Sequence, residues 1–164
     1  IKEILDTSRL DFTQEKQDAE TFDLSECLPA ICEPYQLIAK AKGLDFSFSI
    51  QGKCPVHTSK KGLEKILSNL LSNAVSYTKP GCKITVLLTA RQIKIENECT
   101  PIPPDKLAHV FEPFYRPDFA RDRKDGGNGL GLYIVDTLSK ALGLPYQFEA
   151  TKNPPGMCFI LYLP

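Results

Sequence analysis

Apolar residues recur every three or four positions between residues 60 and 78, a spacing typical of a helix with one buried face. Thr58 or Ser59 is a suitable N-cap, and the run from Lys79 to Gly81 ends the helix. The predicted buried positions are Leu63, Ile66, Leu67, Leu70, Leu71, Ala74 and Val75. The pattern therefore predicts one long amphipathic helix.

A second helix is predicted to begin near Leu24, because Asp23 and Glu26 have the spacing of a capping box, and to end at Gly43. Two prolines lie inside this segment, so we expect the helix to be kinked or split. The polar residues 13–20 before it are expected to form a linker or a frayed end.

Five segments have the pattern of strands. Residues 44–50 alternate strictly between apolar and polar, as a half-buried strand does. Residues 83–90 and 92–97 predict an antiparallel hairpin, and 145–150 and 157–163 are expected to close the sheet. The order of elements predicts an α/β (α+β) two-layer sandwich, with helices on one face of a mixed, mostly antiparallel sheet.

Residues 98–127 are rich in proline, glycine and charge, and predict a long loop with a short helix at 104–111. A loop of this length in a compact domain usually has a function. The run from Gly126 to Gly131 leads directly into a helix that ends near residue 142. Glycine N–H groups at a helix N-terminus suit a phosphate, although a flexible hinge explains the same pattern.

Composition excludes several classes of function. The 164 residues include 20 basic and 20 acidic side chains, so a net charge of zero gives no reason to expect nucleic acid as a partner. The six cysteines have no C-x-x-C spacing and no histidine near a pair, which argues against zinc and favours a reduced, intracellular protein. No run approaches the ~18 apolar residues of a membrane span, and the charged, amphipathic first residues are not those expected of a signal peptide.

Asn69 and Asn73 lie four residues apart, so the predicted helix presents both amides on one face. Their oxygens suit a hydrated Mg²⁺, although the pattern taken alone favours two amides bonded to the backbone or to each other. Three aromatic side chains between Phe111 and Arg116 are expected to anchor the long loop on the core. Arg116 and Arg121 are candidates for phosphate contact, or are simply solvated.

In combination these segments resemble the ATP-binding catalytic domain of sensor histidine kinases, in the superfamily shared with gyrase, Hsp90 and MutL. The motifs appear in the order N-L-L-S-N-A-x-x-Y-T, I-E-N-x-x-x-P-I-P, F-E-P-F-Y-R, G-G-N-G-L-G-L and G-M-C-F-x-x-x-L-P. The resemblance covers residues 22–164 and implies a Bergerat-type fold with a long ATP lid. Residues 1–17 resemble the end of a second dimerisation helix, which leaves 18–164 as the catalytic domain.

The resemblance implies ATP and Mg²⁺ as cofactors. Asn73 would coordinate Mg²⁺ with Asn69 beside it, Tyr77 would lie against adenine, and Asn97 would replace the usual Asp that accepts a hydrogen bond from the adenine amino group. Phe111, Phe114 and Tyr115 would pin the lid, at 98–127, to the sheet. Arg116 and Arg121 would stabilise transition-state charge. The implied nucleotide-contacting residues are Asn69, Asn73, Tyr77, Asn97, Ile102, Phe111, Tyr115, Gly127, Gly129, Leu130, Gly131 and Leu132.

Three positions depart from the family's pattern. Cys99 and Pro101 replace glycines after the adenine-binding residue, so the start of the lid is expected to be stiffer. Ser76 replaces a Lys that often supports a phosphate. We expect nucleotide binding to survive, with a degenerate nucleotide-binding or scaffold module as the alternative. Asn97 with its Pro-Ile-Pro run is similar to vancomycin-resistance-type sensors.

The resemblance also implies a reaction and partners. The ATP-hydrolysing members have a Glu general base where this chain has Asn69, so phosphoryl transfer to a histidine is favoured over an ATPase of the gyrase type. His57 and His109 fall outside any dimerisation helix and are expected to be surface or structural residues. The implied partners are the protein's own phosphoacceptor domain and a response regulator. The fragment is expected to be a monomeric cytoplasmic part of a homodimeric membrane sensor.

Overall fold

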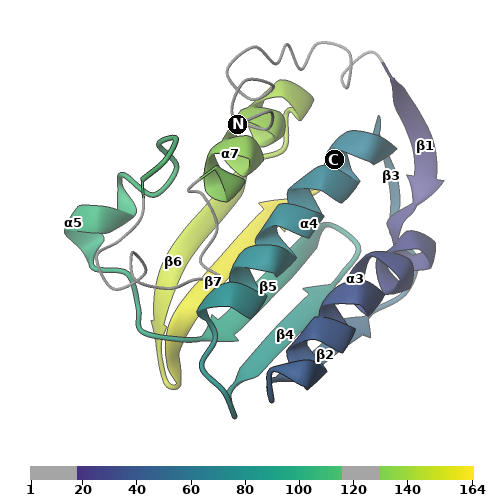
Figure 1. Cartoon of the computed structure of the whole chain (residues 1–164). Coiled ribbons are helices and arrows are strands. Elements are labelled where there is room, and N and C mark those ends of the chain that lie inside the picture. Colours follow the sequence, from purple (N-terminus) through teal and green to yellow (C-terminus); the bar gives the residue numbers. More distant parts are fainter. Residues whose placement is uncertain (1–17, 116–129) are drawn as a thin grey trace.

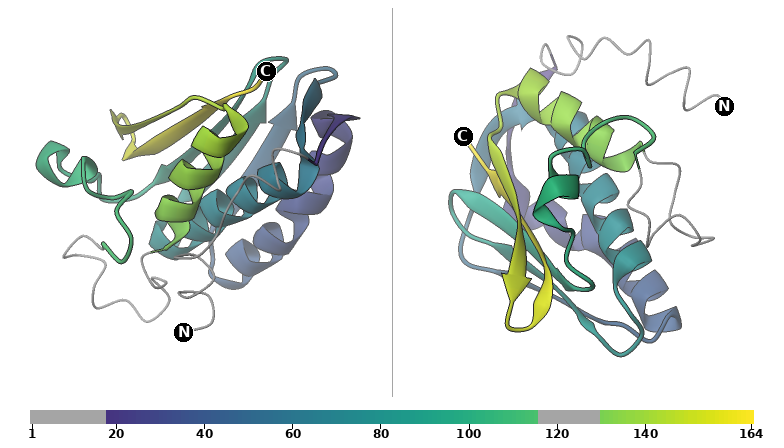
Figure 2. Two further views of the ribbon diagram at one scale, coloured as in Figure 1. Left: turned by 90° about the horizontal axis from the view of Figure 1, so that it is seen from above. Right: turned by 90° about the vertical axis from the view of Figure 1, so that its left-hand side faces the viewer.

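The computed structural model describes residues 18–115 and 130–164. A five-stranded sheet has the order β2-β4-β5-β7-β6, and three helices cover one of its faces (Figures 1 and 2). The strands are β2 (Asp45–Ile50), β4 (Lys83–Leu88), β5 (Gln92–Glu98), β6 (Tyr146–Lys152) and β7 (Pro155–Tyr162). The helices are α3 (Leu24–Ala41), α4 (Lys60–Tyr77) and α7 (Gly131–Leu142), with a short α5 (Pro104–Leu107) at the side.

The sheet is mixed, as predicted. β2 and β4 are parallel, while β4, β5, β7 and β6 are joined by antiparallel pairings. The predicted hairpin is confirmed by the pairing of Ile84 with Asn97 and of Leu88 with Ile93. The view along the sheet in Figure 2 shows helices in one layer and strands in the other, which confirms the two-layer sandwich.

Helix α4 confirms the predicted long helix and provides the centre of the core. Of the two candidate caps, Ser59 is the N-cap, and its Oγ accepts a hydrogen bond from the N–H of Gly62 at 3.0 Å. All seven predicted apolar positions are buried. Because this face packs on the sheet and on α7, the polar face of α4 is left for Asn69, Asn73 and Tyr77, which are half-buried.

Helix α3 is continuous over 18 residues, so the expectation of a split is wrong. Pro29 and Pro34 are both exposed, and each removes only one backbone N–H from the helical ladder. The buried side chains on the opposite face hold the two halves on a common core; they are Leu24, Leu28, Cys32 and Ala39. Tertiary packing therefore outweighs the local cost of the prolines.

A second, two-stranded sheet was not predicted. β1 (Ala19–Asp23) pairs antiparallel with β3 (Pro55–Ser59), so residues 19–20 are not the linker that their polarity suggested. Thr21 lies opposite His57, and the Thr21 hydroxyl is 2.9 Å from His57 Nδ1. The two strands are short and far apart in sequence, so no local sequence pattern predicts their pairing.

Candidate functional site

The side chains of Asn69 and Asn73 meet the first residue of α7. A Cβ atom built on Gly131 would lie 3.3 Å from Asn73 Oδ1 and 3.5 Å from Asn69 Oδ1. Gly131 begins a helix, where backbone N–H groups lack partners within the helix. The two amide oxygens of α4 and the N-terminus of α7 therefore lie together, and glycine leaves the space between them open.

The amide of Asn69 is oriented by its own helix. Its Nδ2 donates a hydrogen bond to the carbonyl oxygen of Lys65, one turn earlier, at 2.8 Å. Because Nδ2 of Asn69 is bonded to the backbone of its own helix, Oδ1 of Asn69 is directed toward Gly131. Asn69 therefore presents a neutral oxygen acceptor to the site, and an amide is no general base.

Asn97 stands at the other end of the site, near the end of β5. Its Nδ2 donates to Thr78 Oγ1 at 3.2 Å, and the buried hydroxyl of Thr78 donates to the carbonyl oxygen of Ala74 at 2.6 Å. This chain links the end of α4 to β5 and turns Asn97 Oδ1 away from Thr78. The orientation suits an oxygen that accepts a hydrogen bond from a ligand.

Gly156 is a residue of this region that the sequence reasoning did not assign to the site. A Cβ built on it would overlap the carbonyl oxygen of Asn97 and lie 3.1 Å from Glu98 Cα. Only glycine allows β7 to approach β5 this closely beside Asn97. The glycine of the G-M-C-F motif was its only signal in the sequence.

The described start of the long loop runs past the end of β7. The N–H of Ile102 donates to Met157 Sδ at 3.4 Å, and Met157 lies opposite Asn97 in the β5–β7 register. Ile102 is half-buried, and so is Tyr77 at the last position of α4. The contact with Met157 therefore places Ile102 near Asn97, at one end of the site.

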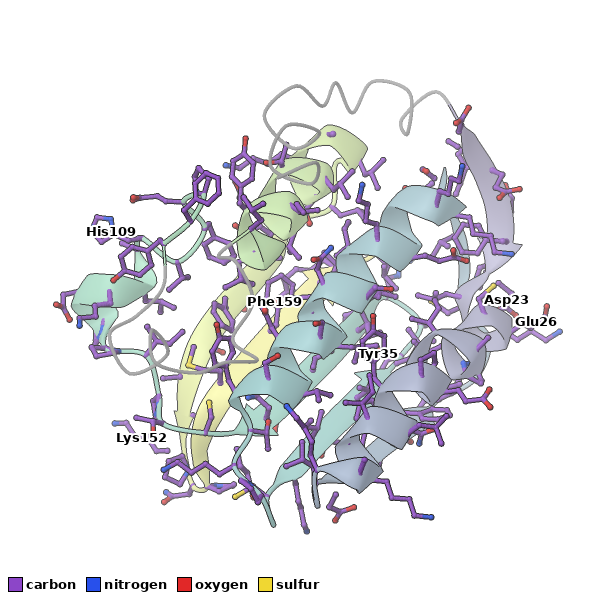
Figure 3. The ribbon with its side chains drawn as sticks, viewed as in Figure 1. Asp23, Glu26, Tyr35, His109, Lys152 and Phe159 are labelled. Carbon is purple, nitrogen blue, oxygen red and sulfur yellow. The ribbon has the colours of Figure 1, made fainter. Side chains whose placement is uncertain are left out.

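Phe111 packs on the sheet, as the resemblance implied. Its ring centroid lies 5.1 Å from that of Tyr146 and 5.9 Å from that of Phe148, and Tyr146 stacks on Phe159 of β7, which Figure 3 labels. The Tyr146 hydroxyl also donates to Asp136 of α7 at 2.6 Å. Burial, with the hydrogen bond to Asp136, raises the pKa of Tyr146 above its ordinary value.

The structure also describes the two other aromatic residues of this segment, Phe114 and Tyr115. Phe114 is 52% exposed and has φ 68°, so the expectation that it pins the loop is wrong in this conformation. The ring of Tyr115 lies 5.8 Å from that of His109, within the same segment. Of these three aromatic residues, Phe111 is the one whose ring contacts rings of the sheet among the described residues, and Val110 beside it is buried.

The remaining implied residues fall into two groups. Arg116, Arg121, Gly127 and Gly129 lie outside the described residues. Leu130 is 1% exposed and belongs to the core, and Leu132 is half-buried against it. Because the Leu130 side chain is enclosed, a ligand at the start of α7 has access only to its backbone.

The two histidines lie on the surface, as expected. His57 is exposed on β3, and His109 Nδ1 is 2.6 Å from the carboxylate of Glu112 on the side of the molecule away from α3 (Figure 3). Within the described ranges, no three His, Cys, Asp or Glu residues are grouped to hold a metal. None of the helices described is both long enough and apolar enough to cross a membrane.

Comparisons with known proteins agree on one family. The model of histidine kinase-, DNA gyrase B-, and HSP90-like ATPases matches residues 58–164. Sensor histidine kinase CusS of Escherichia coli O157:H7 is 31% identical over 168 residues, covering 100% of this chain and 34% of CusS. Sensor protein VanSB of Enterococcus faecalis is 32% identical over 168 residues, covering 100% of this chain and 37% of VanSB.

A solved structure has the same architecture. The mycobacterial sensor histidine kinase MprB superposes with a TM-score of 0.74 at 25% identity, covering 88% of this chain and 97% of that one. The chain spans about a third of the length of the two curated relatives above.

Proposed function

Because this chain belongs to the histidine kinase-, DNA gyrase B- and HSP90-like ATPases, we propose that it binds Mg²⁺–ATP and serves as the catalytic domain of a sensor histidine kinase. One observation carries the proposal. The amide oxygens of Asn69 and Asn73 meet the N-terminus of α7 at Gly131, which is a suitable place for phosphates. The oriented amide of Asn97 provides the adenine end.

The residues present fit a magnesium ion. Mg²⁺ prefers oxygen ligands and keeps several waters, and Asn73 Oδ1 is a neutral oxygen beside the open space at Gly131. Asn73 would hold the ion, with Asn69 Oδ1 beside it. When bound, Mg²⁺ neutralises charge on the phosphates. The glycine-rich run and two arginines of the long loop, Arg116 and Arg121, would complete the phosphate contacts.

At the adenine end, Asn97 Oδ1 would accept a hydrogen bond from the exocyclic amino group. The bond from Asn97 Nδ2 to Thr78 fixes which atom of the amide faces the ligand. The half-buried side chains of Tyr77 and Ile102 would contact the base. An amide in place of a carboxylate keeps the acceptor but removes its charge.

Asn69 favours phosphoryl transfer over hydrolysis of ATP. A water-activating base must accept a proton, and the Asn69 amide does not, while its nitrogen is bonded to Lys65. The acceptor would be a histidine on a dimerisation domain of the longer protein, and a response regulator would receive the phosphoryl group. We place this chain on the cytoplasmic side of a homodimeric membrane sensor.

The test is a calorimetric titration of the chain with ATP, in Mg²⁺ and in a chelator. We expect saturable binding that needs Mg²⁺ and that Asn73→Ala weakens at least about tenfold, or 1.4 kcal/mol. Ser72→Ala is the matched control, because Ser72 is exposed on the same helix, one residue away. Absence of binding at millimolar ATP, or equal binding by Asn73→Ala, would refute the proposal and favour a scaffold module.

A further inference from the structure

Thr78 lies where α4 ends, and its side chain is in contact with both α4 and β5. It is the C-cap of α4, its backbone is extended (φ −79°, ψ 133°), and it is 4% exposed. The carbonyl oxygen of Ala74 accepts two hydrogen bonds from Thr78, one from its N–H at 3.1 Å and one from its hydroxyl at 2.6 Å. A hydroxyl has a single proton, so the proton of Thr78 is used in the bond to Ala74.

The use of that proton determines which end of the Asn97 amide faces Thr78. Two oxygen atoms 2.6 Å apart have a proton between them, and a carbonyl oxygen brings none. Thr78 Oγ1 therefore offers only lone pairs to Asn97, which lies 3.2 Å away on its other side. Only the nitrogen of an amide donates to lone pairs, so Nδ2 of Asn97 faces Thr78 and Oδ1 of Asn97 faces away.

The backbone of Asn97 is held in place by the sheet. Asn97 is paired with Ile84 of β4 on one side and with Met157 of β7 on the other. Its carbonyl oxygen also lies so close to Gly156 that a Cβ there would overlap it. The freedom that remains is rotation of the side chain. A half turn of the amide would exchange Oδ1 and Nδ2 with almost no change in shape, so the hydrogen bond to Thr78 decides between the two orientations.

The orientation of this amide matters for the kind of base that it accepts. Adenine has an exocyclic amino group, which donates a hydrogen bond, whereas hypoxanthine and guanine have a carbonyl oxygen in that place. An oxygen of Asn97 that faces the base suits the amino group and places two acceptors together when a carbonyl oxygen is there. The reversed amide would present N–H groups and would favour the carbonyl oxygen instead.

We propose that Thr78 is a positioning residue that gives the site its selectivity for 6-aminopurine over 6-oxopurine nucleotides, an inference that rests on the proposed nucleotide site. Thr78 acts through Asn97 and contacts no reacting atom. Its hydroxyl donates to Ala74 and thereby accepts from Asn97 Nδ2, which leaves Asn97 Oδ1 for the amino group of the base. Without the hydroxyl of Thr78, the amide of Asn97 is free to take either orientation.

Alanine and serine are the informative substitutions at position 78. Thr78→Ala and Thr78→Ser both lack the methyl group of threonine, and they differ from each other by one oxygen atom. The carbonyl of Ala74 keeps its bond from the backbone N–H of residue 78 in both variants, so neither leaves it without a partner. Valine is less suitable, because a methyl group in the place of Oγ1 would be too close to the carbonyl oxygen of Ala74.

The experiment is a set of calorimetric titrations with Mg²⁺–ATP and Mg²⁺–ITP, in which inosine has a carbonyl oxygen where adenosine has the amino group. We expect the wild type to bind ATP at least about tenfold more tightly than ITP. Thr78→Ser should keep this preference. In Thr78→Ala the preference should fall at least about tenfold, because ATP binds more weakly while ITP does not.

A second background shows whether Thr78 acts through the amide of Asn97. In Asn97→Asp both terminal atoms of the side chain are oxygens, so there is no orientation left to fix. Adding Thr78→Ala to Asn97→Asp should therefore change the preference for ATP by less than about twofold. Asn73→Ala is the control at the phosphate end, and it should weaken ATP and ITP by the same factor. Far-ultraviolet circular dichroism checks that each variant is folded.

The outcomes separate this inference from the proposed function. ATP binding by the wild type with equal preferences in Thr78→Ala and Thr78→Ser would overturn the role of Thr78 and leave the nucleotide site standing. A loss of preference that persists in the Asn97→Asp background would also overturn it, because the effect would then not require an amide. Equal binding of ATP and ITP by the wild type would remove the selectivity itself. Absence of ATP binding by the wild type would refute the proposed function and this inference with it.

Discussion

At the scale of single residues, a substitution at Gly131 tests ATP binding separately from folding stability. Alanine is favoured over glycine inside a helix by roughly 0.5–1 kcal/mol, but Gly131 is the first residue of α7 and its added Cβ makes a tight contact, so Gly131→Ala is expected to change the free energy of unfolding by less than about 1 kcal/mol. The added methyl group would lie 3.3 Å from Asn73 Oδ1, in the space proposed for phosphates and Mg²⁺. We therefore expect ATP affinity to fall about tenfold, or 1.4 kcal/mol, in a calorimetric titration.

Gly62 supplies the matched control for that substitution. A Cβ on Gly62 would lie 2.9 Å from Leu142 Cδ1, at the contact of α4 with α7 and away from Asn73. Gly62→Ala should cost about 1–3 kcal/mol of stability through overpacking and leave ATP affinity unchanged. If Gly131→Ala bound ATP normally, the space beside the two amides would have no part in binding.

At the scale of elements, Asp23 joins the start of α3 to the chain before β3. Its Oδ1 accepts from the hydroxyl and the N–H of Ser25 and from the N–H of Cys54, at 2.7, 3.0 and 2.9 Å (Figure 3 labels Asp23). These bonds hold the pKa of Asp23 below its ordinary value, and the bond from the Ser25 hydroxyl has the largest effect. A carboxyl with a lowered pKa stabilises the fold above its unfolded-state pKa, and this contribution is lost as pH falls through the folded-state pKa.

Thermal melts of the wild type and Asp23→Ala across acidic pH measure this contribution. We expect the variant to melt lower at neutral pH, and the difference to shrink as pH falls below about 4. Glu26→Ala removes a carboxylate from the same turn but leaves the Asp23 bonds intact, so its effect should be smaller. A difference between wild type and Asp23→Ala that is constant with pH would contradict the assignment.

The elements also show what the sequence determines locally. Helix α4 and the β4–β5 hairpin were predictable because the spacing of their apolar residues identifies the buried face within a short stretch of sequence. The pairing of Thr21 with His57 was not, since strands this short carry no pattern that identifies a distant partner. In the site, Asn69 and Asn73 were found from their spacing on a helix. Gly156 was missed because its need for glycine comes from the carbonyl of Asn97, on another strand.

At the scale of the whole molecule, the proposed site joins three parts of the sandwich. Asn69 and Asn73 come from α4, Gly131 begins α7, and Asn97 lies one residue before the end of β5. None of these side chains is a proton acceptor suited to activating water. The two histidines are exposed, His57 on β3 and His109 in the turn after α5, so we expect the chain to provide a nucleotide site without an acceptor histidine.

That division of roles predicts how the isolated chain behaves with Mg²⁺–ATP. We expect no steady release of phosphate and no phosphohistidine on the chain itself, measured with radiolabelled ATP and acid-labile phosphate analysis. A separate helical hairpin with a phosphoacceptor histidine, taken from a sensor histidine kinase relative, should become labelled only when this chain is present. Asn73→Ala should abolish that labelling, and Ser72→Ala should not. Steady phosphate release by the chain alone, lost in Asn73→Ala, would instead assign it to the hydrolysing members of the family, because Asn69 would then not prevent attack by water.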